Sequence, residues 1–186
     1  MRIISGQFKG KKIANPKDTK TRPLKDLTKE SIFNILVHSN KINLDLNNSN
    51  ILDLFSGVGS FGLECLSRGV KKVTFFENYP LVLSILKSNL KSLNQINNYE
   101  IVEKDIFKTN SLENLKEKFD IIFLDPPYKD KNLDILLKRI NNSKILNSYG
   151  IIILHRHKKT ENNFPEYIKI LEQKKYGISK IIFLTF

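Results

Sequence analysis

A glycine-rich turn is the first segment of this sequence whose residues could do chemistry. Residues 53–62, DLFSGVGSFG, join an apolar run to a helical pattern. Glycines in such a turn let the backbone approach a ligand, and the N–H groups at the start of the helix face it. Glu77 stands 20 residues after Gly57, at the end of the next apolar run, where a carboxylate can accept the hydroxyl protons of a ribose. Together these features predict a site for a nucleoside cofactor.

Two cofactor classes, NAD and S-adenosyl-L-methionine, are compatible with this turn. Asp53 lies inside the expected strand, four residues before Gly57. A carboxylate there would repel the pyrophosphate of NAD but suits the sulfonium and ammonium groups of S-adenosyl-L-methionine. The position of Asp53 therefore favours the latter, and an NAD-linked oxidoreductase stays an alternative, as does a tight turn without a ligand.

The second segment is Asp125-Pro126-Pro127-Tyr128, which directly follows the apolar run 119–124. Two successive prolines make the chain leave the strand in an extended, stiff conformation. The Asp125 carboxylate and the Pro126 carbonyl can then both accept hydrogen bonds from one planar NH2 group. Tyr128 offers a ring on which a base can stack. An ordinary proline-rich strand exit is the alternative interpretation.

The elements that must position these segments alternate between short apolar runs and helical patterns. Strands are expected at 51–55, 73–76, 99–102, 121–124 and 150–154, followed by a closing hairpin of 168–175 and 178–186. Helices are expected at about 24–38, 60–68, 80–93, 112–116 and 133–140. Alternating strands and helices predict an α/β fold with a mostly parallel sheet covered on both faces, and the hairpin adds one antiparallel strand.

Charge and composition limit the class of protein. The 186 residues contain 31 Lys+Arg and 19 Asp+Glu, a net charge of +12. The excess lies at the ends: residues 1–30 carry nine basic and three acidic residues, whereas residues 31–154 carry 15 and 13. This favours a nucleic-acid surface, although Lys accounts for 26 of the 31 basic residues, as an A/T-rich genome would also produce. One Cys and three His predict neither disulfides nor a metal site, and the apolar runs are too short to span a membrane.

These segments together resemble a known family. Residues 53–62, Glu77 and Asp125–Tyr128 resemble class I S-adenosylmethionine-dependent methyltransferases that act on exocyclic amines. The segments RIISG at 2–6, KGKK at 9–12, TRP at 21–23 and KESIFN at 29–34 are similar to the bacterial 16S rRNA (guanine-N2)-methyltransferases of the RsmD type. The resemblance implies a Rossmann-like methyltransferase domain at 45–186 and a basic hairpin-and-helix extension at 1–44 that contacts RNA.

The resemblance also implies roles for particular residues. Gly57 and Gly59 would line the methionine part of the cofactor, Asp53 would orient its amino end, and Glu77 would hold the ribose. Asp105, beside Ile106, would accept from the adenine amino group. The full set of implied cofactor residues is Asp53, Phe55, Gly57, Gly59, Glu77, Asn78, Asp105 and Ile106. The catalytic set is Asp125, Pro126, Pro127 and Tyr128, and the RNA-binding set is Lys9, Lys11, Lys12, Arg22 and Lys29.

The expected activity is transfer of a methyl group to the N2 amine of a guanine in 16S rRNA of the small ribosomal subunit, by a cytoplasmic monomer without a metal. Related tetrapeptides leave N6-adenine methylation of DNA or RNA and glutamine methylation of a protein as alternatives, and a non-catalytic RNA-binding protein as a third. His155-Arg156-His157 is interpreted as a basic loop near RNA.

Overall fold

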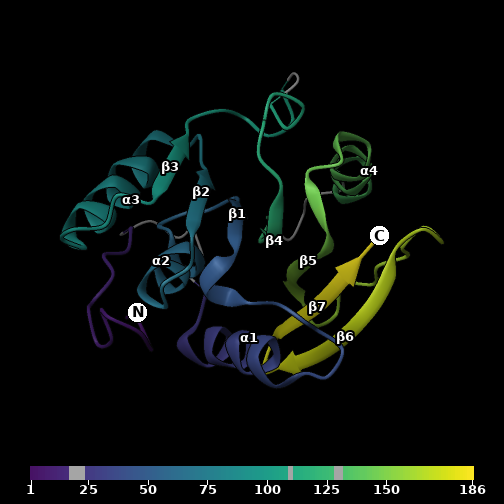
Figure 1. The fold of residues 1–186 in the computed structure, drawn as a ribbon, viewed down its shortest axis with the longest axis horizontal. Helices are drawn as coiled ribbons and strands as arrows, with labels where there is room; N and C mark the ends of the chain where they lie inside the picture. The colour runs from purple at the N-terminus through teal and green to yellow at the C-terminus, as the bar shows by residue number, and fades with distance from the viewer. Residues whose placement is uncertain (17–23, 109–110, 128–131) are drawn as a thin grey trace.

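The computed structural model describes residues 1–16, 24–108, 111–127 and 132–186, which form a seven-stranded sheet with helices on both faces (Figure 1). The strands are β1 (Asn50–Leu54), β2 (Lys72–Phe76), β3 (Tyr99–Val102), β4 (Phe119–Leu124), β5 (Leu146–His157), β6 (Lys169–Tyr176) and β7 (Ser179–Thr185). The α-helices of these residues are α1 (Asp26–His38), α2 (Ser60–Ser67), α3 (Pro80–Ser92) and α4 (Leu133–Ser143), and Leu46–Asn48 form a short 3-10 helix, η1.

The strand order is β3-β2-β1-β4-β5-β7-β6, and β1 to β5 are parallel. β7 is antiparallel to both β5 and β6, so it alone runs against the others. This confirms the expected mostly parallel sheet with one reversed strand from a terminal hairpin. The order changes direction at β1, with β2 on one side and β4 on the other, and ligands of open α/β sheets bind at such a point.

The register decides which residues emerge together at the carboxyl edge of the sheet. Leu54 is paired with Phe76 in β2 and with Leu124 in β4. Leu124 is in turn paired with Leu154 in β5. The residues that follow these partners therefore lie side by side, and they are Glu77 after β2, Asp125 after β4 and His155 within β5.

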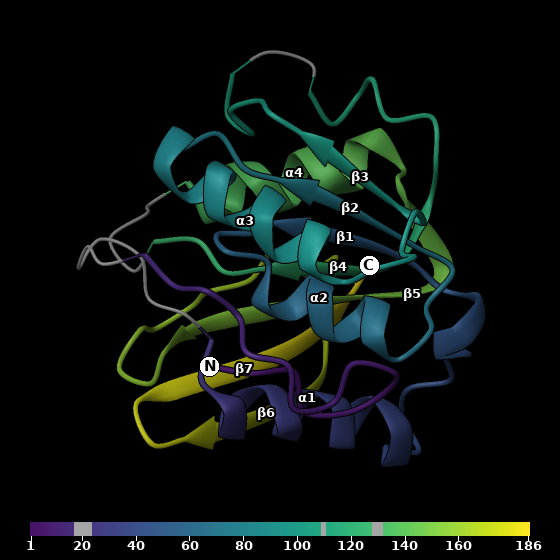
Figure 2. The same ribbon diagram turned by 90° about the vertical axis from the view of Figure 1, so that its left-hand side faces the viewer.

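Each face of the sheet has its own apolar core. Ile51 and Phe123 face α1, α2 and α3, whereas Leu52 and Leu124 face α4. Figure 2 shows α2 and α3 in front of the sheet and α4 behind it. Because side chains alternate along a strand, Asp53 points to the same face as Ile51, toward α2.

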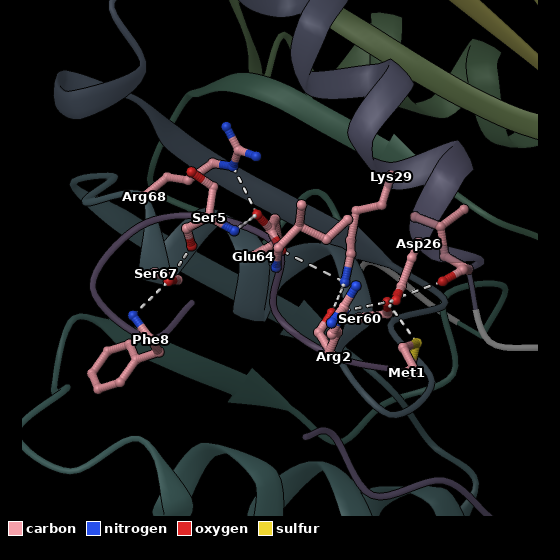
Figure 3. A network of polar contacts seen from close by, with 12 residues as sticks. Met1, Arg2, Ser5, Phe8, Asp26, Lys29, Ser60, Glu64, Ser67 and Arg68 are labelled. Atoms are coloured by element: carbon pink, nitrogen blue, oxygen red, sulfur yellow. Dashed lines mark hydrogen bonds and ion pairs between the residues drawn. The ribbon is translucent and has the colours of Figure 1, made fainter. Parts of the chain in front are cut away.

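The N-terminal residues pack against α2 instead of standing apart. A single antiparallel bridge between Arg2 and Lys12 closes the expected hairpin, and Ile3 and Ile13 are buried in the core with α2. Glu64 of α2 receives this segment: its two carboxylate oxygens accept from the backbone N–H groups of Ile4 at 2.7 Å and Ser5 at 3.0 Å. Figure 3 shows Glu64 beside Ser5.

Three features differ from the sequence-based expectations. The helix expected at 112–116 is absent: residues 111–114 form a turn and 115–116 have no regular structure, because a five-residue segment is too short to offset the cost of helix nucleation. Residues 47–50 lie between the helix expected at 24–38 and the strand expected at 51–55, and they contain the end of η1 and the first residue of β1. β5 extends through His157, so His155, Arg156 and His157 belong to a strand and not to a loop.

Candidate active site

The glycine-rich turn joins β1 to α2 with three residues in the left-handed region. Phe55 has φ 60°, Gly57 has φ 57° and Gly59 has φ 85°. A Cβ on Gly59 would lie 2.5 Å from Cδ1 of Leu86, so α3 packs too closely for a side chain there. The Gly57 position is open, since a Cβ there would meet only the Phe55 carbonyl oxygen, at 3.9 Å. The turn thus presents backbone at Gly57 that a ligand can approach.

Glu77 holds this turn from the neighbouring strand. Its Oε2 accepts from the Gly57 N–H at 2.8 Å, and its Oε1 accepts from the N–H groups of Asn78 at 2.9 Å and Tyr79 at 2.8 Å. The same carboxylate therefore fixes the glycine turn and the start of α3. Each carboxylate oxygen has two lone pairs, so Glu77 can still accept from a ribose hydroxyl. Asn78 is exposed next to it.

Asp53 lies beneath the turn and is 1% exposed. Its Oδ2 accepts from the Gly62 N–H in the first turn of α2, at 3.0 Å. Gly62 is required here, because a Cβ on it would lie 2.2 Å from Cε1 of Phe75. Because residue 62 is glycine, the backbone of α2 lies close enough to the sheet for its N–H group to donate to Asp53.

Three carboxylates converge at this edge. They belong to Glu77, Asp53 and Asp125, at the ends of the adjacent strands β2, β1 and β4. Burial raises the pKa of Asp53 to about 8; the Gly62 hydrogen bond opposes this rise, and the negative charges of Asp125 and Glu77 add to it. Such a site favours a positively charged ligand, because a cation beside the three groups would relieve their repulsion and stabilise ionised Asp53.

Replacing Asp53 with Asn should change how the stability of the ligand-free protein depends on pH. The native pKa of about 8 lies above the value of about 3.9 in an unfolded chain. Between these values only the native state retains the proton, so this group makes wild-type stability fall as pH rises. Asn has no such proton, so the variant should gain up to about 1.4 kcal/mol in free energy of unfolding per pH unit relative to wild type.

Urea unfolding at several pH values between about 5 and 8 measures this difference. Asp134→Asn is the matched control, because Asp134 is exposed on α4 and its replacement should leave the pH dependence unchanged. Parallel curves for wild type and Asp53→Asn would show that Asp53 is ionised throughout this range.

The residues after β3 form the other side of the cofactor region. Asp105 is half-buried, and its Oδ1 accepts from the Phe107 N–H at 2.9 Å, which closes a local turn. Ile106 is buried in the core on the α4 face. The rings of Phe55 and Phe107 lie 5.9 Å apart, so the glycine turn and this segment are in contact. The structure thus brings the two predicted cofactor segments together.

Asp125, Pro126 and Pro127 follow β4 directly, as the sequence predicted, and Tyr128 lies outside the described residues. Sequence reasoning missed the groups that hold Asp125. Its Oδ1 lies 2.8 Å from Nδ1 of His155 on β5, and Nε2 of His155 lies 3.0 Å from Oγ of Ser179 on β7. The interpretation of His155 as part of an RNA-contacting loop is wrong, because the side chain is buried and points to Asp125.

The predicted RNA-binding residues fall into different environments. Lys9 and Lys12 are exposed, Lys11 donates to the Ser92 carbonyl, and Arg22 lies outside the described residues. The prediction for Lys29 is wrong. Its side chain is fully buried, donates to the Arg2 carbonyl at 2.6 Å and lies 3.6 Å from the Glu64 carboxylate, so no phosphate can reach it.

Within the described parts of the chain, no helix combines the length and apolar character needed to cross a membrane. The same residues contain no group of three or more His, Cys, Asp or Glu placed to hold a metal ion.

A Rossmann-like sheet with one reversed strand and a glycine turn at its carboxyl edge defines the class I methyltransferase fold. The solved structure of yhhF from Escherichia coli has this fold, with a TM-score of 0.80 and 26% identity over 99% of this chain and 96% of that one. Residues 1–185 match the family described as "Conserved hypothetical protein 95", and the chain belongs to this family.

Curated relatives agree with this assignment. Ribosomal RNA small subunit methyltransferase D of Haemophilus influenzae is 32% identical over 183 residues, which is 96% of this chain and 90% of that protein. YlbH of Bacillus subtilis is 34% identical over 185 residues, which is 97% of this chain and 96% of that protein. The resemblance to the RsmD type is thereby confirmed.

Proposed function

We propose that this protein transfers a methyl group from S-adenosyl-L-methionine to the N2 amine of a guanine in 16S rRNA of the small ribosomal subunit. The observation that carries the proposal is the meeting of Asp53, Glu77 and Asp125 around an open glycine turn, next to a proline-stiffened strand exit. The relative named ribosomal RNA small subunit methyltransferase D supports the choice of substrate. We further propose that the protein acts in the cytoplasm as a monomer, with residues 1–44 as an RNA-binding extension.

The residues present fit this cofactor. Asp53 and the backbone at Gly57 and Gly59 would hold its charged methionine end, since the site is rich in carboxylates. Glu77, with Asn78 beside it, would hold the ribose. Asp105 and Ile106 would flank the adenine, with Phe55 closing the same side. When bound, S-adenosyl-L-methionine supplies an electrophilic methyl group, which the amine nitrogen takes in exchange for a proton, leaving a neutral thioether.

The chain's own contribution is to orient a poor nucleophile. The lone pair of a guanine amine is delocalised into the ring. Hydrogen bonds from its two N–H groups to Asp125 and to the Pro126 carbonyl would favour a more tetrahedral nitrogen whose lone pair points away from the ring. Asp125 would then take the proton that the nitrogen releases and pass it to water. Tyr128 would stack on the base, which must leave its helix to enter the site.

Incubation with labelled S-adenosyl-L-methionine tests the proposal. The acceptors are small ribosomal subunits, free 16S rRNA, duplex DNA and a peptide-chain release factor, and nuclease digestion followed by mass spectrometry identifies the product. N2-methylguanine in 16S rRNA is expected. Label that appears only in N6-methyladenine or in protein glutamine would overturn the substrate assignment, and binding of NADH in preference to S-adenosylhomocysteine would overturn the cofactor.

Neutralising the exposed lysines of the extension should weaken RNA binding and spare the cofactor site. For the double variant Lys9→Gln/Lys12→Gln, the slope of log affinity against log salt should fall by about 0.7–0.9 per lost phosphate contact. Filter binding of rRNA at several salt concentrations measures this slope, and calorimetry with S-adenosylhomocysteine should give an unchanged affinity.

The matched control is Lys116→Gln/Lys118→Gln, which removes the same charge from exposed positions just before β4, outside residues 1–44. Equal effects of the two double variants would mean that net charge, and not the extension, determines RNA binding.

A further inference from the structure

We propose that His155 is a positioning residue that orients the Asp125 carboxylate, and that Ser179 holds the imidazole of His155 in place from the other side. The inference rests on the proposed function, in which Asp125 accepts from the target amine. It concerns a chain of three side chains from three segments: Asp125 after β4, His155 in β5 and Ser179 in β7.

The sheet brings these groups together. Leu124 is paired with Leu154, so Asp125 and His155 are the next residues along two adjacent parallel strands. β7 lies on the other side of β5 and begins at Ser179, which is paired with His157. His155 is 6% exposed and Ser179 is 5% exposed, whereas the Asp125 side chain keeps 20% of its surface accessible. The chain therefore runs from a buried hydroxyl to a carboxylate that keeps part of its surface accessible.

The hydrogen bonds suit one tautomer. If Nδ1 carries the proton, it donates to Oδ1 of Asp125 at 2.8 Å, and Nε2 accepts from the Ser179 hydroxyl at 3.0 Å. Every group then has a complementary partner. Oδ1 of Asp125 is occupied by this bond, which leaves Oδ2 to face the amine.

The two prolines explain why the segment after β4 is held by side chains and not by backbone hydrogen bonds. Pro126 and Pro127 have no N–H, so the segment after Asp125 cannot donate to β5 as a continuing strand would. Side chains of β5 hold the segment instead: His155 binds Asp125, and Nη1 of Arg156 donates to the Pro127 carbonyl at 3.4 Å. His155 and Arg156, successive residues of β5, thus hold Asp125 and Pro127 of the proposed catalytic segment.

Steady-state methylation of small subunits by four variants tests the proposal. His155→Leu removes both bonds and should lower kcat by about 10–100-fold, the loss typical of residues that orient functional groups, with no change in S-adenosylhomocysteine affinity. His155→Asn places an amide donor near the Nδ1 position and should restore most of kcat. Ser179→Ala should lie between wild type and His155→Leu. His157→Leu, the same change two residues further along β5, is the matched control and should retain the wild-type kcat.

Long-range nitrogen–proton NMR spectra of the imidazoles give a readout independent of turnover. We expect the Nδ1–H tautomer for His155 in wild type and also in Ser179→Ala, because the Asp125 carboxylate at Nδ1 can only accept. An Nε2–H tautomer in wild type, or a wild-type kcat for a folded His155→Leu, would overturn the proposal. If wild type does not methylate rRNA, the proposed function fails, and the tautomer alone then decides whether His155 orients Asp125.

Discussion

Replacing Asp125 with alanine is expected to lower the rate of methyl transfer by about 10²–10³-fold while S-adenosylhomocysteine still binds. In the proposed function, the carboxylate is the side-chain acceptor for the target amine, and it also takes the proton released on methylation. The proposed cofactor contacts come instead from the glycine turn and from Glu77, which is fixed by three backbone N–H groups and does not depend on Asp125. Single-turnover methylation and calorimetry measure the two effects separately.

Asp134→Ala is the control for this variant, since it removes an exposed carboxylate nine residues further along the chain. It should turn over at the wild-type rate. If Asp125→Ala also did so, Asp125 would have no part in orienting the amine. If instead it lost cofactor binding, Asp125 would belong to the cofactor site and not to the target-base site.

Three parts of the candidate site could be predicted from the sequence: the glycine turn, Glu77 and the Asp125 segment. Each is a short stretch at the end of a single apolar run, so no long-range contact has to be known to find it. Their assembly also follows from the parallel order, which places successive strand ends at one edge. His155 and Ser179 could not be found in this way. They lie 30 and 54 residues after Asp125, and only the register of β4, β5 and β7 makes them neighbours. The one available signal was the spacing of His155 and His157, which places both side chains on one side of a strand that continues past Leu154.

Lys29 was predicted wrongly, because the resemblance implied an RNA contact for a side chain that lies in the core. Its spacing from Ile32, Phe33 and Leu36 is i+3, i+4 and i+7, which places it on the buried stripe of α1. A lysine on that stripe needs a buried partner, and the partner is Glu64 on a different helix. Helical spacing could therefore have predicted the burial of Lys29, but its ion pair depends on how the extension packs against α2.

The strongest effect on stability is expected from Glu64→Ala. Glu64 and Lys29 are both fully buried, and the carboxylate accepts from the N–H groups of Ile4 and Ser5 and from Nε of Arg68 at 2.9 Å. Burial lowers the pKa of Lys29, and the nearby Glu64 carboxylate opposes that shift and favours the charged ammonium. Removing Glu64 leaves the buried lysine without its counter-charge and two backbone donors without an acceptor. The free energy of unfolding should fall by about 3–5 kcal/mol.

Chemical denaturation measures this loss, and Glu30→Ala on the exposed side of α1 is the matched control, with an expected change within about 0.5 kcal/mol. Lys29→Met combined with Glu64→Ala should be more stable than Glu64→Ala alone, because the second change removes the uncompensated charge. Additive losses in the double variant would mean that the two side chains act independently.

Glu64 also anchors residues 4 and 5 of the extension. Glu64→Ala should therefore weaken rRNA binding more than Lys29→Met does. The reverse order would mean that Lys29 contacts RNA directly, and not that Glu64 acts by docking the extension on α2.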